Sequence, residues 1–492
     1  MHNQPHPTVS GQGDDTPGQG SRPARGQELE LDVDTLAFGG EGVARWGEQG
    51  YVVFVAGAIP GDRVRAVIHK RKRSYAHART VQILEASPER MAPTAPHPGV
   101  PWQVLPYARQ LEIKRCQVDE ALRRIGGLDG FDLEEIVPAV AQWRYRNKLE
   151  YSFGCDPETG ELQCGFHAPA GSNQVVPIDD CLLASESGNL ARRVALDWCR
   201  TQGLGAWSRR ADRDTQDASR GQRTGPDADG RALLRNLVVR EGRNTDRLQV
   251  RLVSTDGELE IDSFAQALSE SLGERLSGVL WTRSRALGET TAGGDTQLVW
   301  GEAELPERLG ELELRISPEA FFQTNTEMAQ VLYELVGEYA ALQGWERVYD
   351  LYCGIGTIAL TLAPRAGEVW GIEVVQGAIA NAITAAQRNE ITNAHFFAGD
   401  ARLALPELLE RAGRPDVVVL DPPRAGLSQK VVRRVIDAAP RRIVYVSCNP
   451  TTLAPNAAQL AGAGYQLRRV RPLDMFPQTH HVECVALLER TQ

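Results

Sequence analysis

The clearest hydrophobic pattern lies in residues 321–492, where short apolar runs alternate with stretches of helical periodicity. The apolar runs, which we expect to be strands, are Arg347–Tyr352, Glu368–Glu373, Ala394–Phe397, Asp416–Asp421, Arg442–Ser447, Tyr465–Pro472 and Val482–Glu489. Apolar strands separated by helices are typical of a parallel sheet covered on both faces. We therefore predict a doubly wound, Rossmann-like α/β domain over 321–492, closed by an antiparallel hairpin of the last two runs.

A different pattern occupies residues 27–86. Its strand-like runs, separated by Gly and Pro turn signals, are Leu29–Val33, Val52–Val55, Val64–His69 and Thr80–Leu84. Short strands at this spacing predict a small, OB-like β-barrel. The preceding residues 1–26 are rich in Gly, Pro, Gln and Asp without periodicity, which predicts a disordered tail.

Positive charge gathers in the last strands of the predicted barrel. The residues that we expect to bind RNA there are Lys70, Arg71, Lys72 and Arg73. Aromatic side chains lie close by in the sequence, at Tyr51, Phe54 and Tyr75. A small barrel with basic and aromatic groups suits contacts with the RNA backbone and stacking on bases. The alternative is a solvated strand edge whose charge prevents aggregation.

Residues 87–320 predict a mixed α+β central domain. Ala108–Ile125 has helical periodicity. The expected strands are Tyr145–Gly154, Gly165–Ile178, Leu233–Arg240, Arg247–Ser254 and Gly278–Thr282. Residues 208–231 are polar and of low complexity, so we expect a flexible surface insertion there.

Composition and charge exclude several classes of protein. The chain of 492 residues is 42% hydrophobic, which supplies enough apolar material for about three domains. The net charge of −10 argues against nucleic-acid binding when read alone, but a local basic patch matters more than the sum. The eight cysteines form no Cys-x-x-Cys pair, so neither a disulfide scaffold nor a zinc ribbon is expected.

Targeting and membrane signals are missing from the sequence. Its start has no basic region followed by an apolar stretch, and no uncharged apolar run of about 18 residues occurs. We therefore expect a cytoplasmic protein that binds no membrane, and nothing in the sequence implies an obligate protein partner.

The segment from Val348 to Thr357 carries the strongest local signal. An apolar strand leads into Gly354-Ile355-Gly356, where glycines let a ligand approach the backbone. Glu373 ends the next strand, 19 residues after Gly354, where an acid can accept hydrogen bonds from both ribose hydroxyls. Because no third glycine completes a pyrophosphate-binding turn, we expect S-adenosylmethionine as the cofactor. The alternative is an ordinary tight turn.

Two further strand ends place carboxylates toward the same crevice. Asp400 follows the third strand, where it can reach the adenine amino group of a cofactor. Asp421 ends the fourth strand, in Asp421-Pro422-Pro423-Arg424. Amine methyltransferases tend to carry Asn-Pro-Pro-aromatic at this position, so the Asp and Arg argue against an exocyclic amine as substrate.

A cysteine ends the fifth strand, in Ser447-Cys448-Asn449-Pro450. At the carboxyl edge of the sheet it is placed as a nucleophile, and its loop setting disfavours the alternative of a buried apolar cysteine. Cys353 lies inside the predicted cofactor turn, and we interpret it as a packing residue.

Glu483 begins the final apolar run, after Thr479-His480-His481-Val482. A carboxylate at this place is either an exposed edge residue or a general base, and the pattern does not decide between them. The two histidines have no third ligand at suitable spacing, so no metal site is predicted.

Together these residues resemble the RNA uracil-5-methyltransferase family, which makes 5-methyluridine in tRNA or ribosomal RNA. The resemblance runs from residue 27 to the end, apart from 208–231. The motifs that carry it are Ala37–Arg45 and Ala58–Asp62, which resemble the TRAM domain, Tyr145–Lys148 and Gly165–His167 in the central domain, Ser317–Asn325 at the start of the catalytic domain, Asp421–Arg424, Ser447–Pro450 and His481–Glu483.

The resemblance implies roles for individual residues. The cofactor and target site would be lined by Gln323, Tyr352, Glu373, Asp400 and Asp421. Cys448 would be the nucleophile that adds to C6 of uracil, and Glu483 the base that removes the C5 proton. The substrate would be tRNA or 23S rRNA, bound with the help of the TRAM barrel.

The chain departs from the family at one place. Many members hold a [4Fe–4S] cluster on four cysteines, three of them in Cys-Pro-His-x-Gly-Val-Cys-Gly-Gly-Cys. This chain has Ala95 at the first position and is shortened by four residues at Pro101, so only Cys181 resembles a ligand. One thiolate cannot hold the cluster, and we expect none. We expect packing to hold the shortened loop, with Trp102 and Tyr107 as anchors.

Two other functional classes are alternatives to uridine methylation. An RNA 5-methylcytosine methyltransferase typically has a second cysteine beside the fourth-strand motif, where this chain reads Asp421-Pro422-Pro423-Arg424. A non-catalytic RNA-binding protein or RNA chaperone would retain the fold without its chemistry, but both Cys448 and Glu483 are intact. Uridine methylation therefore remains the preferred prediction.

Overall fold

A computed structural model describes residues 22–168, 174–207, 231–286 and 288–491. The chain forms two compact units, residues 1–91 and 92–492. Most of the expected N-terminal tail and of the expected insertion at 208–231 lies outside the described residues. Among the described helices, none has the length and apolar character that a bilayer crossing requires.

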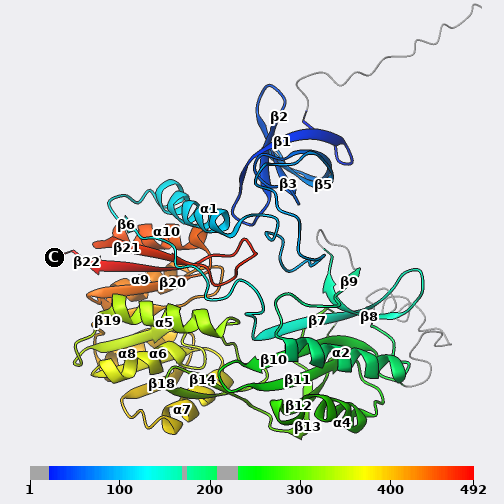
Figure 1. Ribbon diagram of the computed structural model, residues 1–492. Coiled ribbons are helices and arrows are strands. Elements are labelled where there is room, and N and C mark those ends of the chain that lie inside the picture. Colours follow the sequence, from blue (N-terminus) through cyan, green and yellow to red (C-terminus); the bar gives the residue numbers. More distant parts are fainter. Residues whose placement is uncertain (1–21, 169–173, 208–230, 287, 492) are drawn as a thin grey trace, which may run out of the picture. The chain divides into compact units, whose positions relative to one another are not determined.

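The first unit contains a closed five-stranded barrel, blue in Figure 1. Its strands are β1 (Glu28–Leu36), β2 (Gly42–Trp46), β3 (Tyr51–Ala56), β4 (Arg63–Arg71) and β5 (Tyr75–Glu85), in the order β1-β2-β3-β5-β4. Alternate residues fill the interior: Val64, Ala66 and Ile68 of β4 are fully buried while their neighbours point outward. The expected OB-like barrel is confirmed, with β2 as a strand that the pattern did not show.

The second unit contains a seven-stranded sheet in the order β13-β12-β11-β10-β7-β8-β9. Its strands are β7 (Lys148–Cys155), β8 (Leu162–His167), β9 (Val175–Pro177), β10 (Leu234–Gly242), β11 (Arg247–Ser254), β12 (Leu276–Arg283) and β13 (Asp295–Gly301). Helices α2 (Glu186–Thr201) and α4 (Ile261–Leu272) share one core with the sheet, which includes Trp198 and Phe264. The predicted strand Gly165–Ile178 is wrong as a single element, because β8 and β9 are separate antiparallel strands.

An eight-stranded sheet forms the rest of the second unit, in the order β18-β17-β16-β19-β20-β22-β21-β6. Its strands are β6 (Asp132–Leu133), β16 (Arg347–Leu351), β17 (Glu368–Glu373), β18 (Ala394–Ala398), β19 (Val417–Leu420), β20 (Arg442–Ser447), β21 (Tyr465–Leu473) and β22 (Glu483–Arg490). Strands β16 to β20 pair in parallel, and β22 is antiparallel to both β20 and β21. The expected terminal hairpin is confirmed.

Helices cover both faces of this sheet (Figure 1). One face shares a core with α5 (Thr326–Ala340), α6 (Thr357–Leu362) and α7 (Gln376–Arg388). The opposite face packs against α8 (Ala401–Ala412), α9 (Gln429–Ala438) and α10 (Pro450–Ala461). On that face the hydroxyl of Tyr349 donates to Leu408 O of α8, and Tyr445 donates to Asn456 of α10. The doubly wound prediction is therefore confirmed.

Two further elements connect the sheets. Helix α1 (Tyr107–Glu120) continues into a π-helical turn, Ala121–Ile125, and leads to β6, so part of the segment expected in the central domain adds a strand to the eight-stranded sheet. The hairpin β14 (Leu305–Leu309) and β15 (Leu312–Ile316) precedes α5.

Candidate active site

In the eight-stranded sheet, the order of the parallel strands changes direction between β16 and β19. Ligands of such sheets bind beyond the carboxyl ends of the strands, at the point where the order changes. The turn after β16 is shaped for close approach, because Tyr352, Gly354 and Gly356 all have positive φ angles, of 68°, 55° and 81°. A Cβ on Gly356 would lie 2.8 Å from Phe396 and 2.9 Å from Ala382. Only glycine fits there, so the turn can pack directly on Phe396 of β18 and on α7.

Glu373 lies at the end of β17, beside this turn. One of its carboxylate oxygens accepts from Gly354 N at 3.3 Å, and the other accepts from Val375 N at 2.9 Å. These bonds hold the carboxylate at the strand end, half-buried, where the sequence predicted an acceptor for ribose hydroxyls.

A cavity of about 430 Å³ opens next to Glu373. Its lining residues are Tyr352, Ile372, Glu373, Val374, Gly399, Asp400, Ala401, Arg402, Gly426, Ser428, Lys430 and Val431. Asp400 begins α8 and accepts from Arg402 N at 2.8 Å. Burial, together with Asp400 and Glu373, raises the pKa of Tyr352, so its hydroxyl stays a neutral hydrogen-bonding group. Three of the five residues expected at the cofactor thus meet in one cavity of suitable size for a nucleoside.

The sequence did not indicate Arg402, Ser428 and Lys430, which line the same cavity. They lie on α8 and at the start of α9, where no motif marks them. For Ser428 and Lys430 the signal that could have found them is the loop after Asp421, and for Arg402 it is the helix that begins after Asp400, because the segments after parallel strands border the ligand crevice.

Two buried carboxyl groups lie at the ends of β16 and β19. Asp350 accepts from Ala359 N at 3.0 Å through one oxygen. Burial and, after it, the neighbouring Asp421 raise its pKa to about 8. Burial also raises the pKa of Asp421 to about 7. At neutral pH each of these groups can hold or release a proton.

Cys448 and Glu483 come together through strand pairing. β20 and β22 are antiparallel, with Ser447 opposite Cys484. The next position along this register sets Cys448, half-buried, beside Glu483, which is 3% exposed. The nucleophile and the base expected from the sequence are therefore neighbours across the same strand pair.

Burial governs the protonation of this pair. It raises the pKa of Cys448 to about 11, with Glu483 adding to the effect and Arg424 opposing it. It also raises the pKa of Glu483, and so does the negative charge of Asp421, while Arg424 again opposes. Arg424 thus acts on both groups. Burial lowers the pKa of His480 and His481, and nearby cations, Arg424 among them, lower it further. Uncharged histidines leave Arg424 as the cation facing the pair from its loop.

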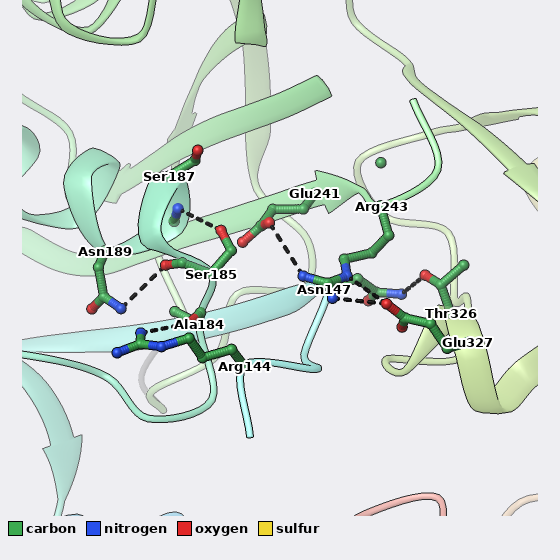
Figure 2. A network of polar contacts seen from close by, with 12 residues as sticks. Arg144, Asn147, Ala184, Ser185, Ser187, Asn189, Glu241, Arg243, Thr326 and Glu327 are labelled. Carbon is green, nitrogen blue, oxygen red and sulfur yellow. Dashed lines mark hydrogen bonds and ion pairs between the residues drawn. The ribbon is translucent and has the colours of Figure 1, made fainter. Parts of the chain in front are cut away.

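Gln323, the fourth expected cofactor residue, does not line the cavity. It is 7% exposed and lies just before α5. Asn147 holds this segment: its amide donates to Gln323 O and to Thr326 Oγ1, both at 2.8 Å, and its backbone N–H donates to Thr324 O. Figure 2 shows the surrounding network, in which Asn147 donates to Thr326 and Arg243 lies between Glu241 and Glu327. The backbone N–H of Glu241 donates to Asn147 O at 2.7 Å. The central motif Tyr145–Lys148 thereby fixes the start of the catalytic domain.

The residues around Cys181 do not fit an iron–sulfur cluster, which needs four protein ligands. Cys181 is fully buried, and its sulfur lies 3.2 Å from His97 Nε2. Because His97 Nδ1 accepts from Gly99 N, the proton is on Nε2, which donates to the sulfur. Burial lowers the pKa of His97 to about 4, so it is neutral. Within the described ranges, no three His, Cys, Asp or Glu side chains are grouped to hold a metal ion.

The four basic residues expected to bind RNA form the hairpin between β4 and β5 in the first unit. Lys70, Arg71, Lys72 and Arg73 are all exposed. Aromatic rings continue the same outer surface: Phe54 and His77 stack with centroids 5.4 Å apart, and Tyr75 contacts both of them. The surface thus combines exposed positive charge with aromatic rings, the two features on which the prediction of RNA binding rests.

This fold, with a nucleoside-sized cavity at the switch point and an acid on the second strand, defines an S-adenosylmethionine-dependent methyltransferase. Comparison with known proteins narrows the class to one family. Residues 302–491 match the family model described as tRNA (uracil-5-)-methyltransferase, and residues 23–81 match the TRAM domain. The chain belongs to the tRNA (uracil-5-)-methyltransferase family.

Relatives match over nearly the whole chain. An uncharacterized RNA methyltransferase of Gloeobacter violaceus is 37% identical, covering 95% of this chain and 97% of its own. Another from Chlorobaculum tepidum is 35% identical, covering 90% and 92%. The solved tRNA (uracil-54, C5)-methyltransferase of Pyrococcus abyssi, in complex with S-adenosyl-L-homocysteine, superposes with a TM-score of 0.70 at 26% identity, over 94% of this chain and all of its own. The expectation of an RNA methyltransferase that uses S-adenosylmethionine is confirmed.

Proposed function

We propose that this protein methylates C5 of a specific uridine in tRNA or 23S rRNA through a covalent bond between Cys448 and C6. The observation that carries the proposal is the pairing of β20 with β22, which sets Cys448 beside Glu483. The match to a tRNA (uracil-5-)-methyltransferase model supports the same target atom.

The chemistry explains why both residues are needed. C5 of uracil is a poor nucleophile because the ring is electron-poor and conjugated. When the Cys448 thiolate adds to C6, the C5=C6 bond opens and electron density moves onto C5 and O4 as an enolate. Tyr352, Glu373 and Asp400 would hold S-adenosylmethionine in the cavity that they line, and it would supply the electrophilic methyl group. As C5 forms its bond to the methyl carbon, the S–CH3 bond would break and its electrons would stay on the sulfur of S-adenosylhomocysteine.

Glu483 then completes the cycle. The methylated ring is saturated and still bound to Cys448, and it carries one proton on C5. The Glu483 carboxylate takes this proton, the electrons of the C5–H bond form the C5=C6 double bond again, and the C6–S bond breaks to release the thiolate. Asp421, whose pKa burial raises to about 7, would support the charge changes of the uracil ring. Gln323, which the resemblance assigns to the same site, lies in the segment held by Asn147.

RNA recognition is shared between the units. A uridine within folded RNA must leave its stack to reach the crevice. The exposed cluster Lys70–Arg73 would bind phosphates, and the overall charge of −10 implies that this binding is local and sensitive to salt. We place the reaction in the cytoplasm, together with its RNA substrate.

The alternatives have less support. A 5-methylcytosine enzyme would need a second cysteine near Asp421, where Pro422, Pro423 and Arg424 stand. A non-catalytic RNA-binding protein or RNA chaperone would not need the buried pairing of Glu483 with Cys448. Methylation of transcribed tRNA and 23S rRNA by the pure protein, followed by mass spectrometry of nucleosides, separates these functions. We expect 5-methyluridine in one RNA class; 5-methylcytosine or no methylated base would contradict the proposal.

A further inference from the structure

The loop between β21 and β22, residues 474–482, leads directly to Glu483, and residues of other elements hold its first five positions, 474–478. Three consecutive carbonyls accept side-chain hydrogen bonds: Met475 O from Asn325 at 2.9 Å, Phe476 O from Lys114 at 3.1 Å, and Pro477 O from Tyr145 at 3.1 Å. Fixed carbonyls in succession leave this loop few alternative conformations.

Gln478 is the most constrained residue of the loop. Its backbone has a φ of 66°, in the left-handed region that a residue with a side chain rarely adopts. Its N–H donates to Gln110 Oε1 at 3.0 Å, and its own Oε1 accepts from Gln110 Nε2 at 2.8 Å. Its carbonyl accepts from Trp102 N at 3.0 Å. Trp102, Gln110 and Gln478 are all buried, and we call these three residues the clamp.

The clamp uses the segment in which the family resemblance places cluster cysteines. At one end of this segment, His97 donates a hydrogen bond to the sulfur of Cys181. At the other end, the backbone N–H of Trp102 donates to Gln478 O. Gln110 also donates to Trp102 O and Leu105 O, both at 3.0 Å, so a single buried amide joins this segment to the loop that precedes Glu483.

Glu483 depends on this support. No hydrogen bond within the described part of the chain orients its carboxylate, although the residue is 3% exposed. Its position against Cys448 is therefore set by its backbone, which is held by the pairing of Glu483 with Leu473 of β21 and by the loop before it, where Gln478 lies five residues earlier. A general base must lie within hydrogen-bond reach of the proton that it takes.

We propose that Gln110 is a positioning residue for proton abstraction, because through the clamp it fixes the backbone that carries Glu483. This inference rests on the proposed function. Loss of the clamp would leave Cys448 and the cofactor cavity in place, so addition and methyl uptake would proceed. Removal of the C5 proton would slow, and the methylated adduct between Cys448 and RNA would persist.

The test is a single-turnover reaction of the full-length protein with substrate RNA and S-adenosylmethionine labelled in its methyl group. Labelled adduct and labelled free RNA are separated on a denaturing gel. For Gln110→Ala we expect the ratio of adduct to free product to rise roughly 10- to 100-fold, as expected for a displaced catalytic group. Cofactor affinity and KM for RNA should stay within about twofold of wild type. Gln249→Ala is the matched control, because Gln249 is also buried and its amide also donates to a backbone carbonyl, Ala303 O.

If Gln110→Ala does not fold, a second variant, Gln478→Gly, tests the same proposal. Gln478→Gly removes the side-chain acceptor at a position where glycine adopts the left-handed backbone without strain. Persistent adduct in this variant supports the clamp. Turnover like wild type overturns it, and so does a parallel loss of adduct formation and cofactor binding, which indicates a merely structural role. Failure of the wild-type protein to form any adduct would instead contradict the proposed function.

Discussion

As the proposed nucleophile, Cys448 would react from an unfavourable protonation state, because burial raises the pKa of its thiol to about 11. Only the thiolate attacks C6, and below the pKa its fraction rises about tenfold with each pH unit. We therefore expect kcat/KM for adduct formation to rise steadily through neutral and mildly alkaline pH. Rapid-quench rates with 5-fluorouridine RNA would measure this profile, with cofactor affinity over the same range as the control. A plateau below about pH 8.5, the ordinary thiol value, would contradict the assignment.

Glu483→Gln should stall the enzyme after methyl uptake. The amide keeps the size of the side chain but cannot accept the C5 proton, and a positioned base contributes about 10²–10⁴-fold. We expect a methyl-labelled protein–RNA adduct on a denaturing gel, with little free product. Glu489→Gln, on the same strand but in a surface ion pair with Arg442, is the control. A variant that binds RNA but never takes up label would place Glu483 earlier in the cycle.

The sequence indicated some residues of the candidate site clearly and others not at all. Tyr352, Glu373 and Asp400 follow recognisable strand ends, and the structure brings them to one cavity. Glu483 was ambiguous in the sequence, because only the pairing with β20 shows that it is buried beside Cys448. Arg402 and Lys430 reach the cavity from helices whose sequence carries no motif.

At the scale of elements, the strands of both sheets were predicted where apolar runs were long. β2 was missed because Gly42–Trp46 is a short strand between turn signals. β8 and β9 were predicted as one strand, although residues 168–173 read Ala-Pro-Ala-Gly-Ser-Asn, a run of turn-forming residues that indicates a break between two strands.

The hairpin that carries Lys70–Arg73 gives a prediction at this scale. Neutralising all four residues with glutamine should weaken RNA binding and flatten its dependence on salt. Each lost phosphate contact reduces the slope of log K against log salt by about 0.7–0.9. Fluorescence anisotropy across a salt series would measure the slope.

The control for the hairpin replaces exposed arginines elsewhere, Arg124→Gln and Arg285→Gln, whose side chains are 79% and 85% exposed. We expect these changes to leave the slope nearly unaltered. An unchanged slope in the hairpin variant would mean that its charge only solvates the edge of the barrel.

At the scale of the whole molecule, the contacts that shape the site join distant parts of the chain. Gln110 and Gln478 are 368 residues apart, and Lys114 and Asp474, which form a buried ion pair at 2.5 Å, are 360 apart. Hydrophobic periodicity is a local signal, so it cannot report such pairs. The same limit hid β6, a two-residue strand that joins the sheet beside β21.

The whole protein should also be free of iron. Cys181 is hydrogen-bonded to His97, and Ala95 and Pro101 have no thiolate. The residues present therefore do not fit an iron–sulfur cluster. Anaerobically purified protein should be colourless and keep full activity in air and with chelators. Brown protein that contains iron and sulfide in stoichiometric amounts would contradict the prediction that no cluster is bound.

The central claim is that Cys448 attacks C6 of uridine, and trapping with 5-fluorouridine RNA tests it most directly. Fluorine cannot leave C5 as a proton, so the wild-type protein should form a denaturation-resistant adduct, and mass spectrometry should place the RNA on Cys448. Cys448→Ala should form no adduct and no 5-methyluridine while binding S-adenosylmethionine with nearly unchanged affinity, and Cys155→Ala, at an exposed cysteine, should behave as wild type. Adduct or 5-methyluridine made by Cys448→Ala would contradict the account.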